Sequence, residues 1–106
     1  MTGSSGLIGS QTVTFLHNKG YKVLGIDNDL RAYFFGEASS TRVTYNALIK
    51  NLLQYYHHHI DIRNFIELEK IFMEYSSDID IVVHTAAQPS HEWAAKEPLT
   101  DFSINA

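Results

Sequence analysis

A glycine-rich loop near the start of the chain offers the first residues that could do chemistry. Gly3, Gly6 and Gly9 stand at every third position, directly before a stretch of helical character. In a loop that cradles phosphates, one glycine permits a turn with positive φ, a second lets the backbone approach a pyrophosphate, and a third lets helix and strand pack closely. The N-terminus of the following helix offers free N–H groups and the positive end of its dipole. The loop is therefore a candidate site for a diphosphate.

An acidic residue, Asp27, supports the interpretation of the loop as a dinucleotide site. The spacing Gly-x-x-Gly-x-x-Gly departs from the Gly-x-Gly-x-x-Gly fingerprint, so the loop alone fits a plain glycine-rich helix start equally well. Asp27 ends the next β-rich run, about where a Rossmann fold places an acid, roughly 20 residues after the glycines. A carboxylate there accepts hydrogen bonds from ribose hydroxyls and repels a 2′-phosphate, which favours NAD over NADP. An aspartate at a strand end is also a common turn former, and that alternative stays open.

The elements that must position these groups alternate between helix and strand. We expect helices at 7–19, 45–53, 65–75 and from Pro98 onward, strands at 21–27, 55–62 and 79–85, and irregular chain at 28–44. Gly20 closes the first helix, and Asn64, with Glu67 after it, caps the third. Residues 79–85 are nearly all apolar after Asp80, as in a strand covered on both faces. This alternation predicts an α/β fold with a parallel sheet and right-handed crossovers.

Composition and charge exclude several classes of function. The 106 residues carry a net charge of −4, which argues against a nucleic-acid partner, because such a partner needs a clustered basic face. The chain has no cysteine, and no apolar run approaches the ~20 residues of a membrane span. The first residues lack the features of a signal peptide. We therefore expect no membrane association and a cytoplasmic location.

Two further clusters have open interpretations. On a strand, only His57 and His59 of the three consecutive histidines share a face, and two imidazoles make a weak metal site, so we expect no metal. Tyr33, Phe34, Phe35 and Trp93 could form an apolar wall near a substrate or a subunit contact. Packing in the core is the alternative for part of this aromatic set.

Several segments together resemble a known enzyme family. The glycine loop and Asp27, taken with Asp61-Ile62-Arg63 and His84-Thr85-Ala86-Ala87, are similar to the extended short-chain dehydrogenases/reductases, in the NAD-dependent epimerase/dehydratase group that acts on nucleotide sugars. Residues 28–36 and 85–95 look like the CDP-paratose 2-epimerase (CDP-tyvelose epimerase) branch. The resemblance implies that residues 1–106 are the N-terminal part of a doubly wound, parallel-sheet Rossmann domain. Because only Met1 and Thr2 precede the first glycine, the first strand would be largely missing, and the rest of the cofactor domain and the substrate domain would lie outside this chain.

The resemblance also implies which residues bind NAD. The backbone of Gly3, Gly6, Leu7, Ile8 and Gly9 would hold the pyrophosphate, Asp27, Asn28 and Arg31 the adenosine side, Asp61 and Ile62 the adenine, and Thr85, Ala86, Ala87 and Gln88 the nicotinamide-side ribose. Asn105 would support the active-site network. Each has a plain alternative. Asp61 could cap the helix near Asn64, the alanines could fill the core, and Asn105 could be a surface residue.

For function, the resemblance implies a nucleotide-sugar epimerase. In the complete enzyme NAD+ would oxidise a sugar carbon, C2 in the CDP-paratose branch, and the same hydride would return to the re-faced intermediate. Such an enzyme would take a nucleotide-diphosphate sugar, CDP-linked in that branch, and would be a homo-oligomer when complete. The family's catalytic Tyr-x-x-x-Lys pair is absent, because no tyrosine here has a lysine four positions on, so we expect this chain alone to be inactive. Two alternatives stay open: an NAD-dependent dehydratase or reductase, and a non-catalytic NAD-binding protein.

Overall fold

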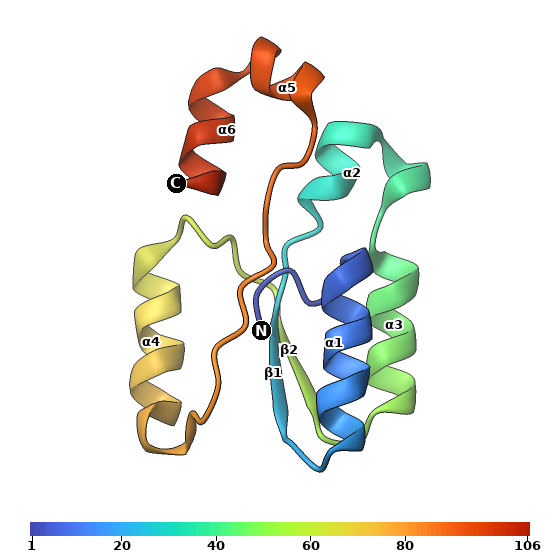
Figure 1. Ribbon diagram of the computed structural model, residues 1–106, viewed down its shortest axis with the longest axis vertical. Coiled ribbons are helices and arrows are strands. Elements are labelled where there is room, and N and C mark those ends of the chain that lie inside the picture. Colours follow the sequence, from blue (N-terminus) through green and yellow to red (C-terminus); the bar gives the residue numbers. More distant parts are fainter.

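A short parallel sheet lies at the middle of the molecule, with helices on two sides (Figure 1). The computed structural model describes residues 1–106. Strand β1 (Val23–Ile26) pairs in parallel with β2 (Tyr55–His58), in a register that joins Val23 to Tyr55 and Ile26 to His58. Helices α1 (Leu7–Asn18) and α3 (Arg42–Asn51) lie on one side of the strands, and α4 (Phe65–Tyr75) lies on the other. The predicted α/β class and the parallel pairing are confirmed.

The first residues of the chain occupy a strand position beside β1. Thr2 forms one isolated parallel bridge to Ile26 and another to His84. The Ile26 amide donates to the Met1 carbonyl at 2.8 Å, and the Thr2 amide donates to the Val83 carbonyl at 3.0 Å. The backbone order is therefore β2, β1, the chain start and residues 83–85, as in one half of a doubly wound sheet. The first strand is reduced to a single bridge residue, as the sequence predicts.

Three helices form with the ends that their sequences indicate. After α1, Gly20 takes a φ of 92°, a conformation that favours glycine. Before α4, the side-chain oxygen of Asn64 accepts a hydrogen bond from the Glu67 amide at 3.2 Å. Helix α6 (Pro98–Asn105) begins at Pro98, which lacks the N–H that a first helical turn leaves unpaired.

Two short helices form where the sequence indicates none. Helix α2 (Leu30–Phe35) and a 3-10 turn (Glu37–Ser39) replace most of the irregular chain expected at 28–44, and α3 begins at Arg42. The Asp29 carboxylate accepts hydrogen bonds from the Thr41 amide and hydroxyl at 2.8 and 3.0 Å. This contact, rather than hydrophobic periodicity, closes the segment around α2. Helix α5 (His91–Lys96) is likewise too short for a helical period to show in the sequence.

The strand expected at 79–85 does not form. A 3-10 turn (Ser76–Asp78) follows α4, and beyond it only His84 joins a bridge. Ile81 and Val82 are 51% and 57% exposed, so the expectation of a strand covered on both faces is wrong. The cause is the lack of a backbone partner, because the chain start bonds only Val83 and Thr85 of this segment. Strand β2 also ends at His58, short of the expected residue 62.

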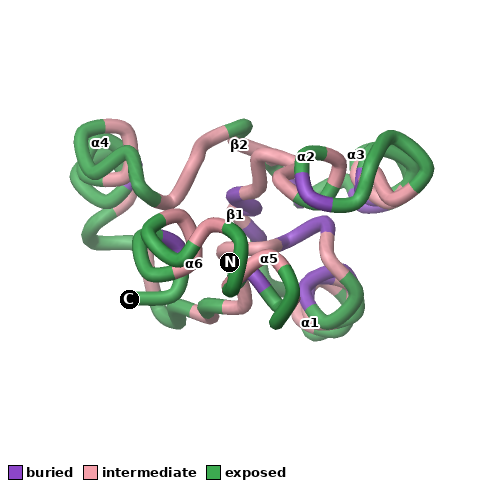
Figure 2. Tube along the Cα trace, turned by 90° about the horizontal axis from the view of Figure 1, so that it is seen from above, coloured by how far each residue is buried: buried purple, intermediate pink, exposed green.

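The buried core lies between α1, α3 and the sheet. Its main cluster consists of Val13, Val23, Leu48, Leu52 and Tyr55. Helix α4 stands apart from this cluster, and an apolar cavity of about 360 Å³ lies between α4 and β1. Seen from above, much of the outer surface of α4 and α6 is exposed (Figure 2). None of the helices combines the length and the apolar character that crossing a membrane requires.

Candidate dinucleotide-binding site

A cavity of about 120 Å³ opens at the edge of the sheet where β1 and β2 end. Its wall brings together most of the predicted site residues: Gly3, Gly6, Asp27, Asn28, Arg31, Ile62, Thr85, Ala86 and Ala87. They come from the glycine loop, from the segments that follow the two strands, from α2 and from residues 85–87 (Figure 1). In open α/β sheets, ligands bind outside the carboxyl ends of the strands, and this cavity lies at that edge.

The three glycines of the loop meet three different spatial demands. Gly3 has a φ of 66°, and a Cβ built there would lie 2.7 Å from the Ala86 amide nitrogen. A Cβ at Gly9, in the first turn of α1, would overlap the Gly3 carbonyl oxygen. Gly6 lines the cavity, and a Cβ there would meet only that same oxygen, at 3.3 Å. Gly3 therefore makes the turn, Gly9 lets helix and loop pack closely, and Gly6 keeps the cavity open.

The Asp27 carboxylate is fixed by two backbone amides. Its Oδ2 accepts a hydrogen bond from the Ser5 amide at 3.0 Å, and its Oδ1 accepts one from the Asp29 amide at 2.9 Å. Each carboxylate oxygen has two lone pairs, so each keeps one for a further donor. Asp27 therefore shapes the turn after β1, and its carboxylate also lies in the cavity wall.

The start of α1 carries unpaired donors. The N–H groups of Leu7 and Ile8 donate to no carbonyl, and Gly6 at the N-cap supplies no side-chain acceptor. Leu7 and Ile8 are 79% and 64% exposed, so neither residue is packed into the core. Free N–H groups and the helix dipole together favour an anionic ligand at this end of the helix.

Asp61 lies just outside the cavity wall, between two isoleucines that line it. Arg63 donates to Asp61 from Nε at 2.9 Å and from a terminal guanidinium nitrogen at 2.6 Å. These hydrogen bonds hold the pKa of Asp61 below its usual value. Asp61 also accepts from the Arg63 amide, while Asn64 caps α4. The structure therefore places Asp61 in a turn before the helix, beside Ile60 and Ile62 in the wall.

Gln88 and Asn105 lie behind the cavity wall and hold it in place. Gln88 is buried. Its backbone N–H donates to Asn105 Oδ1 at 2.9 Å, and its side-chain Nε2 donates to Asp101 Oδ1 at 2.9 Å. Asn105 Nδ2 donates back to the Gln88 carbonyl at 3.1 Å. On the other side, the Thr85 hydroxyl donates to the Thr2 carbonyl at 2.8 Å. Hydrogen bonds therefore hold residues 85–88 to α6 through Asn105 at one end and to Thr2, beside the glycine loop, at the other.

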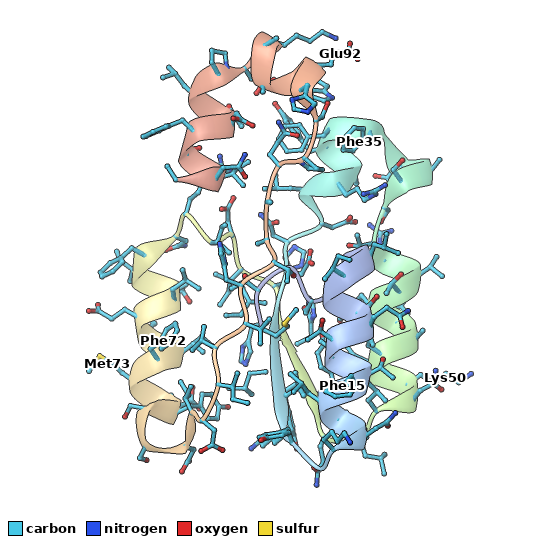
Figure 3. The ribbon with its side chains drawn as sticks, viewed as in Figure 1. Phe15, Phe35, Lys50, Phe72, Met73 and Glu92 are labelled. Carbon is cyan, nitrogen blue, oxygen red and sulfur yellow. The ribbon has the colours of Figure 1, made fainter.

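The remaining wall consists of residues that the sequence analysis did not single out, and of two from the aromatic set. The additional residues are Ile26, Leu30, Thr41, Ile60, Pro89 and Ile104. Phe34 and Phe35 also line the cavity, and Trp93 packs on Phe34 with ring centroids 5.5 Å apart. Figure 3 shows Phe35 on α2. Tyr33 is 61% exposed. The only signal for the additional residues is adjacency, because Ile60 and Pro89 flank predicted positions.

A polar cleft of about 340 Å³ adjoins the cavity. The cavity and the cleft share Asp27, Asn28 and Thr41, and the cleft extends to His57 and His59. Burial lowers the pKa of His57, and the nearby Asp27 carboxylate opposes this effect. The His57 and His59 rings lie 6.5 Å apart, and no group of three His, Asp or Glu side chains converges as metal ligands would.

Comparison with known proteins shows what this chain is similar to. The pattern of the NAD dependent epimerase/dehydratase family matches residues 1–106. A UDP-glucose 4-epimerase of Caenorhabditis elegans is 34% identical over 111 aligned positions, and the match covers 99% of this chain and 30% of the relative. UDP-glucose 4-epimerase 2 of Arabidopsis thaliana is 31% identical, and a UDP-glucose 4-epimerase of Drosophila melanogaster is 29% identical; each match covers 99% of this chain, and 28% and 29% of the relative. The chain thus spans less than a third of the length of these relatives.

Proposed function

The chain belongs to the NAD dependent epimerase/dehydratase family, and from this premise we propose that residues 1–106 form the NAD-binding part of a nucleotide-sugar epimerase. The observation that carries the proposal is the meeting of Gly6, Asp27 and residues 85–87 around one cavity at the carboxyl edge of the sheet. These segments are far apart in the sequence, and a dinucleotide is long enough to contact all of them.

The residues of the cavity fit a dinucleotide. Gly6 leaves its backbone open to a close ligand, and the free amides of Leu7 and Ile8 suit a diphosphate. Ala86 and Ala87 present little side chain where a ribose would meet the backbone. When bound, NAD+ supplies a reversible hydride acceptor. The task of this chain is then to bind and orient that cofactor.

Asp27 supports NAD over NADP in this proposal. Its remaining lone pairs would accept hydrogen bonds from the two ribose hydroxyls of the adenosine half. A 2′-phosphate in the same place would meet a carboxylate and be repelled. Arg31 lines the same cavity, and its guanidinium lies over the Phe35 ring, 5.5 Å from the ring centroid.

Calorimetric titration with NAD+ and NADP+ tests the cofactor proposal. We expect NAD+ to bind the unmodified chain more tightly than NADP+. Asp27→Asn removes the charge, and we expect about tenfold weaker NAD+ binding and a smaller difference between the two cofactors, the scale of one lost charge-assisted hydrogen bond. Asp78→Asn, at an exposed position outside the cavity, is the matched control. Equal binding of NAD+ by the unmodified chain and Asp27→Asn would contradict the proposal.

For the sugar, we propose a CDP-linked substrate of the CDP-paratose type, and therefore epimerisation at C2. The support is the pair of stretches at 28–36 and 85–95, which resemble that branch and pack together through Phe34 and Trp93. The names of the relatives point instead to UDP-glucose and epimerisation at C4. The complete product of the gene that encodes these residues should be assayed with CDP-paratose, CDP-tyvelose, UDP-glucose and UDP-galactose. Turnover of the UDP sugars alone would overturn the CDP assignment.

The same assay separates an epimerase from the other candidate activities. An epimerase interconverts two nucleotide sugars with no net change in NADH. A dehydratase releases water from its substrate, and a non-catalytic protein converts none of the sugars. The 106-residue chain contains no Tyr-x-x-x-Lys pair to move the hydroxyl proton of the substrate. We therefore expect no turnover by this chain alone.

A further inference from the structure

A buried tyrosine reaches from β2 to the underside of the glycine loop. Tyr55 is 5% exposed, and its ring crosses the neighbouring strand at Gly25. A Cβ at Gly25 would overlap the Tyr55 hydroxyl, so only glycine at this position of β1 leaves room for the ring. The ring itself belongs to the main core cluster with Val13 and Leu48.

The hydroxyl of Tyr55 lies between two polar partners. It donates to Ser4 Oγ at 3.0 Å and lies 2.7 Å from His57 Nδ1. Ser4 has no exposed surface, and this hydrogen bond connects its hydroxyl to Tyr55 of β2. Burial raises the pKa of Tyr55 to about 12, and the hydroxyl therefore remains a donor at neutral pH.

Ser4 stands in the glycine loop between Gly3, which makes the turn, and Gly6, which keeps the cavity open. Its amide makes a long hydrogen bond of 3.4 Å to the Ile26 carbonyl, while the next amide, of Ser5, holds Asp27 at 3.0 Å. Through the side chain of Ser4, a hydrogen bond from β2 therefore holds the middle of the loop.

We infer that Tyr55 is a positioning residue for the cofactor site, because its hydroxyl, through Ser4, holds the glycine loop in the conformation that receives a diphosphate. The inference rests on the NAD-binding function proposed above. Tyr55 is not one of the residues that line the cavity. Its effect passes through Ser4 to the backbone of Gly3 and Gly6 and to the Ser5 amide that orients Asp27.

The hydroxyl, rather than the ring, carries this role, and a pair of substitutions isolates it. Tyr55→Phe keeps the ring in the core but leaves Ser4 Oγ buried without its partner. Ser4→Ala removes the other end of the same hydrogen bond. Tyr56→Phe makes the same chemical change one residue along, where the side chain is 46% exposed and lies against Lys22.

The first measurement needs no cofactor. In amide ¹H–¹⁵N spectra and hydrogen exchange, we expect Tyr55→Phe and Ser4→Ala to shift the signals of Gly3, Ser5 and Gly6 and to speed their exchange by about tenfold, the effect of losing one buried hydrogen bond. Tyr56→Phe should leave these signals unchanged. Loop signals in Tyr55→Phe that match those of the unmodified chain would overturn the inference.

The second measurement is the Kd for NAD+. We expect each single variant to weaken binding by about tenfold and the double variant to be no weaker than either, because both remove one interaction. Leu52→Ala, a core variant away from the loop, should lower the unfolding temperature without changing the Kd of the folded protein. Additive losses in the double variant, or an equal loss in Leu52→Ala, would overturn the inference. If the unmodified chain binds no NAD+ while the loop signals respond as expected, the positioning role stands and the proposed function fails.

Discussion

At the scale of single residues, the glycine loop depends on where a methyl group can be tolerated. Gly6 and Gly9 flank the same carbonyl oxygen of Gly3, yet only Gly6 faces the cavity. One position therefore controls access of a ligand, and the other controls the packing of α1 on the loop.

Alanine at these two glycines should separate binding from folding. We expect Gly9→Ala to destabilise the chain by about 2 kcal/mol or more, because its Cβ overlaps backbone that cannot move aside cheaply. Gly6→Ala should cost less than about 1 kcal/mol, since its closest contact is 3.3 Å, but should abolish NAD+ binding by filling the cradle. Urea unfolding and calorimetry measure the two effects. Similar stability losses in both variants would contradict this assignment.

The buried hydroxyl of Tyr55 should make folding sensitive to alkaline pH. Burial raises its pKa from 10.0 to about 12, so between these values the unfolded chain loses a proton that the folded chain keeps. Stability therefore falls as pH rises from 10 to 12, by at most about 3 kcal/mol. Tyr55→Phe should be less stable than the unmodified chain at pH 8 and should show a shallower decline above pH 10. Thermal unfolding at a series of pH values measures this. A decline of equal slope in both proteins would refute it, and Tyr56→Phe is the control.

The sequence identifies residues whose role is local and misses those whose role depends on register. Gly3, Gly6 and Asp27 stand at fixed distances along one loop, helix and strand, so their meeting in one cavity follows from those elements. Tyr55 and Gly25 become partners only through the diagonal pairing of β1 and β2. No spacing in the chain encodes that pairing, so their relation is visible only in the structure.

At the scale of elements, local signals predict helix ends well and tertiary contacts decide the rest. Helix α4 begins where the asparagine cap indicates, because the cap satisfies a donor a few residues away. Helix α2 depends on Asp29 binding Thr41, a contact outside any periodic pattern. Residues 79–85 show the opposite failure, because an apolar run forms a strand only beside a partner with free backbone groups, and residues 1–3 bond only Val83 and Thr85 of this run.

The side chain of Asn64, which caps α4, should contribute measurably to the stability of the chain. Asn64→Ala removes the side-chain acceptor of the Glu67 amide, and we expect a loss of about 1 kcal/mol in the free energy of unfolding. Asn64→Asp keeps an acceptor and should retain most of the stability. Asn51→Ala, at the exposed end of α3, is the control and should change little. Chemical denaturation followed by circular dichroism measures the difference, and an equal loss in the alanine and aspartate variants of Asn64 would rule the cap out.

At the scale of the whole molecule, stability is unevenly shared. The main core cluster joins α1, α3 and the two strands, whereas α4 faces the sheet across an apolar cavity of about 360 Å³. Ile71 is the one buried residue of α4, while Phe65, Ile66 and Met73 are 64% to 73% exposed. In Figure 3, Met73 points outward, away from the rest of the molecule. Few buried contacts therefore hold α4 in place.

This division predicts that α4 opens before the rest of the chain unfolds. In native-state hydrogen exchange at low urea, we expect the amides of α4 to exchange through a local opening, while those of α1, α3 and the strands exchange only on global unfolding. Ile71→Ala should speed exchange in α4 alone, because it removes the only buried anchor of that helix. Leu48→Ala, within the main core cluster, should instead speed exchange everywhere by the full loss of global stability, about 2–5 kcal/mol. If Ile71→Ala lowered protection in α1 and α3 as much as in α4, the chain would be a single cooperative unit. The contacts between α4 and the sheet around the apolar cavity would then be strong enough for the two to unfold together.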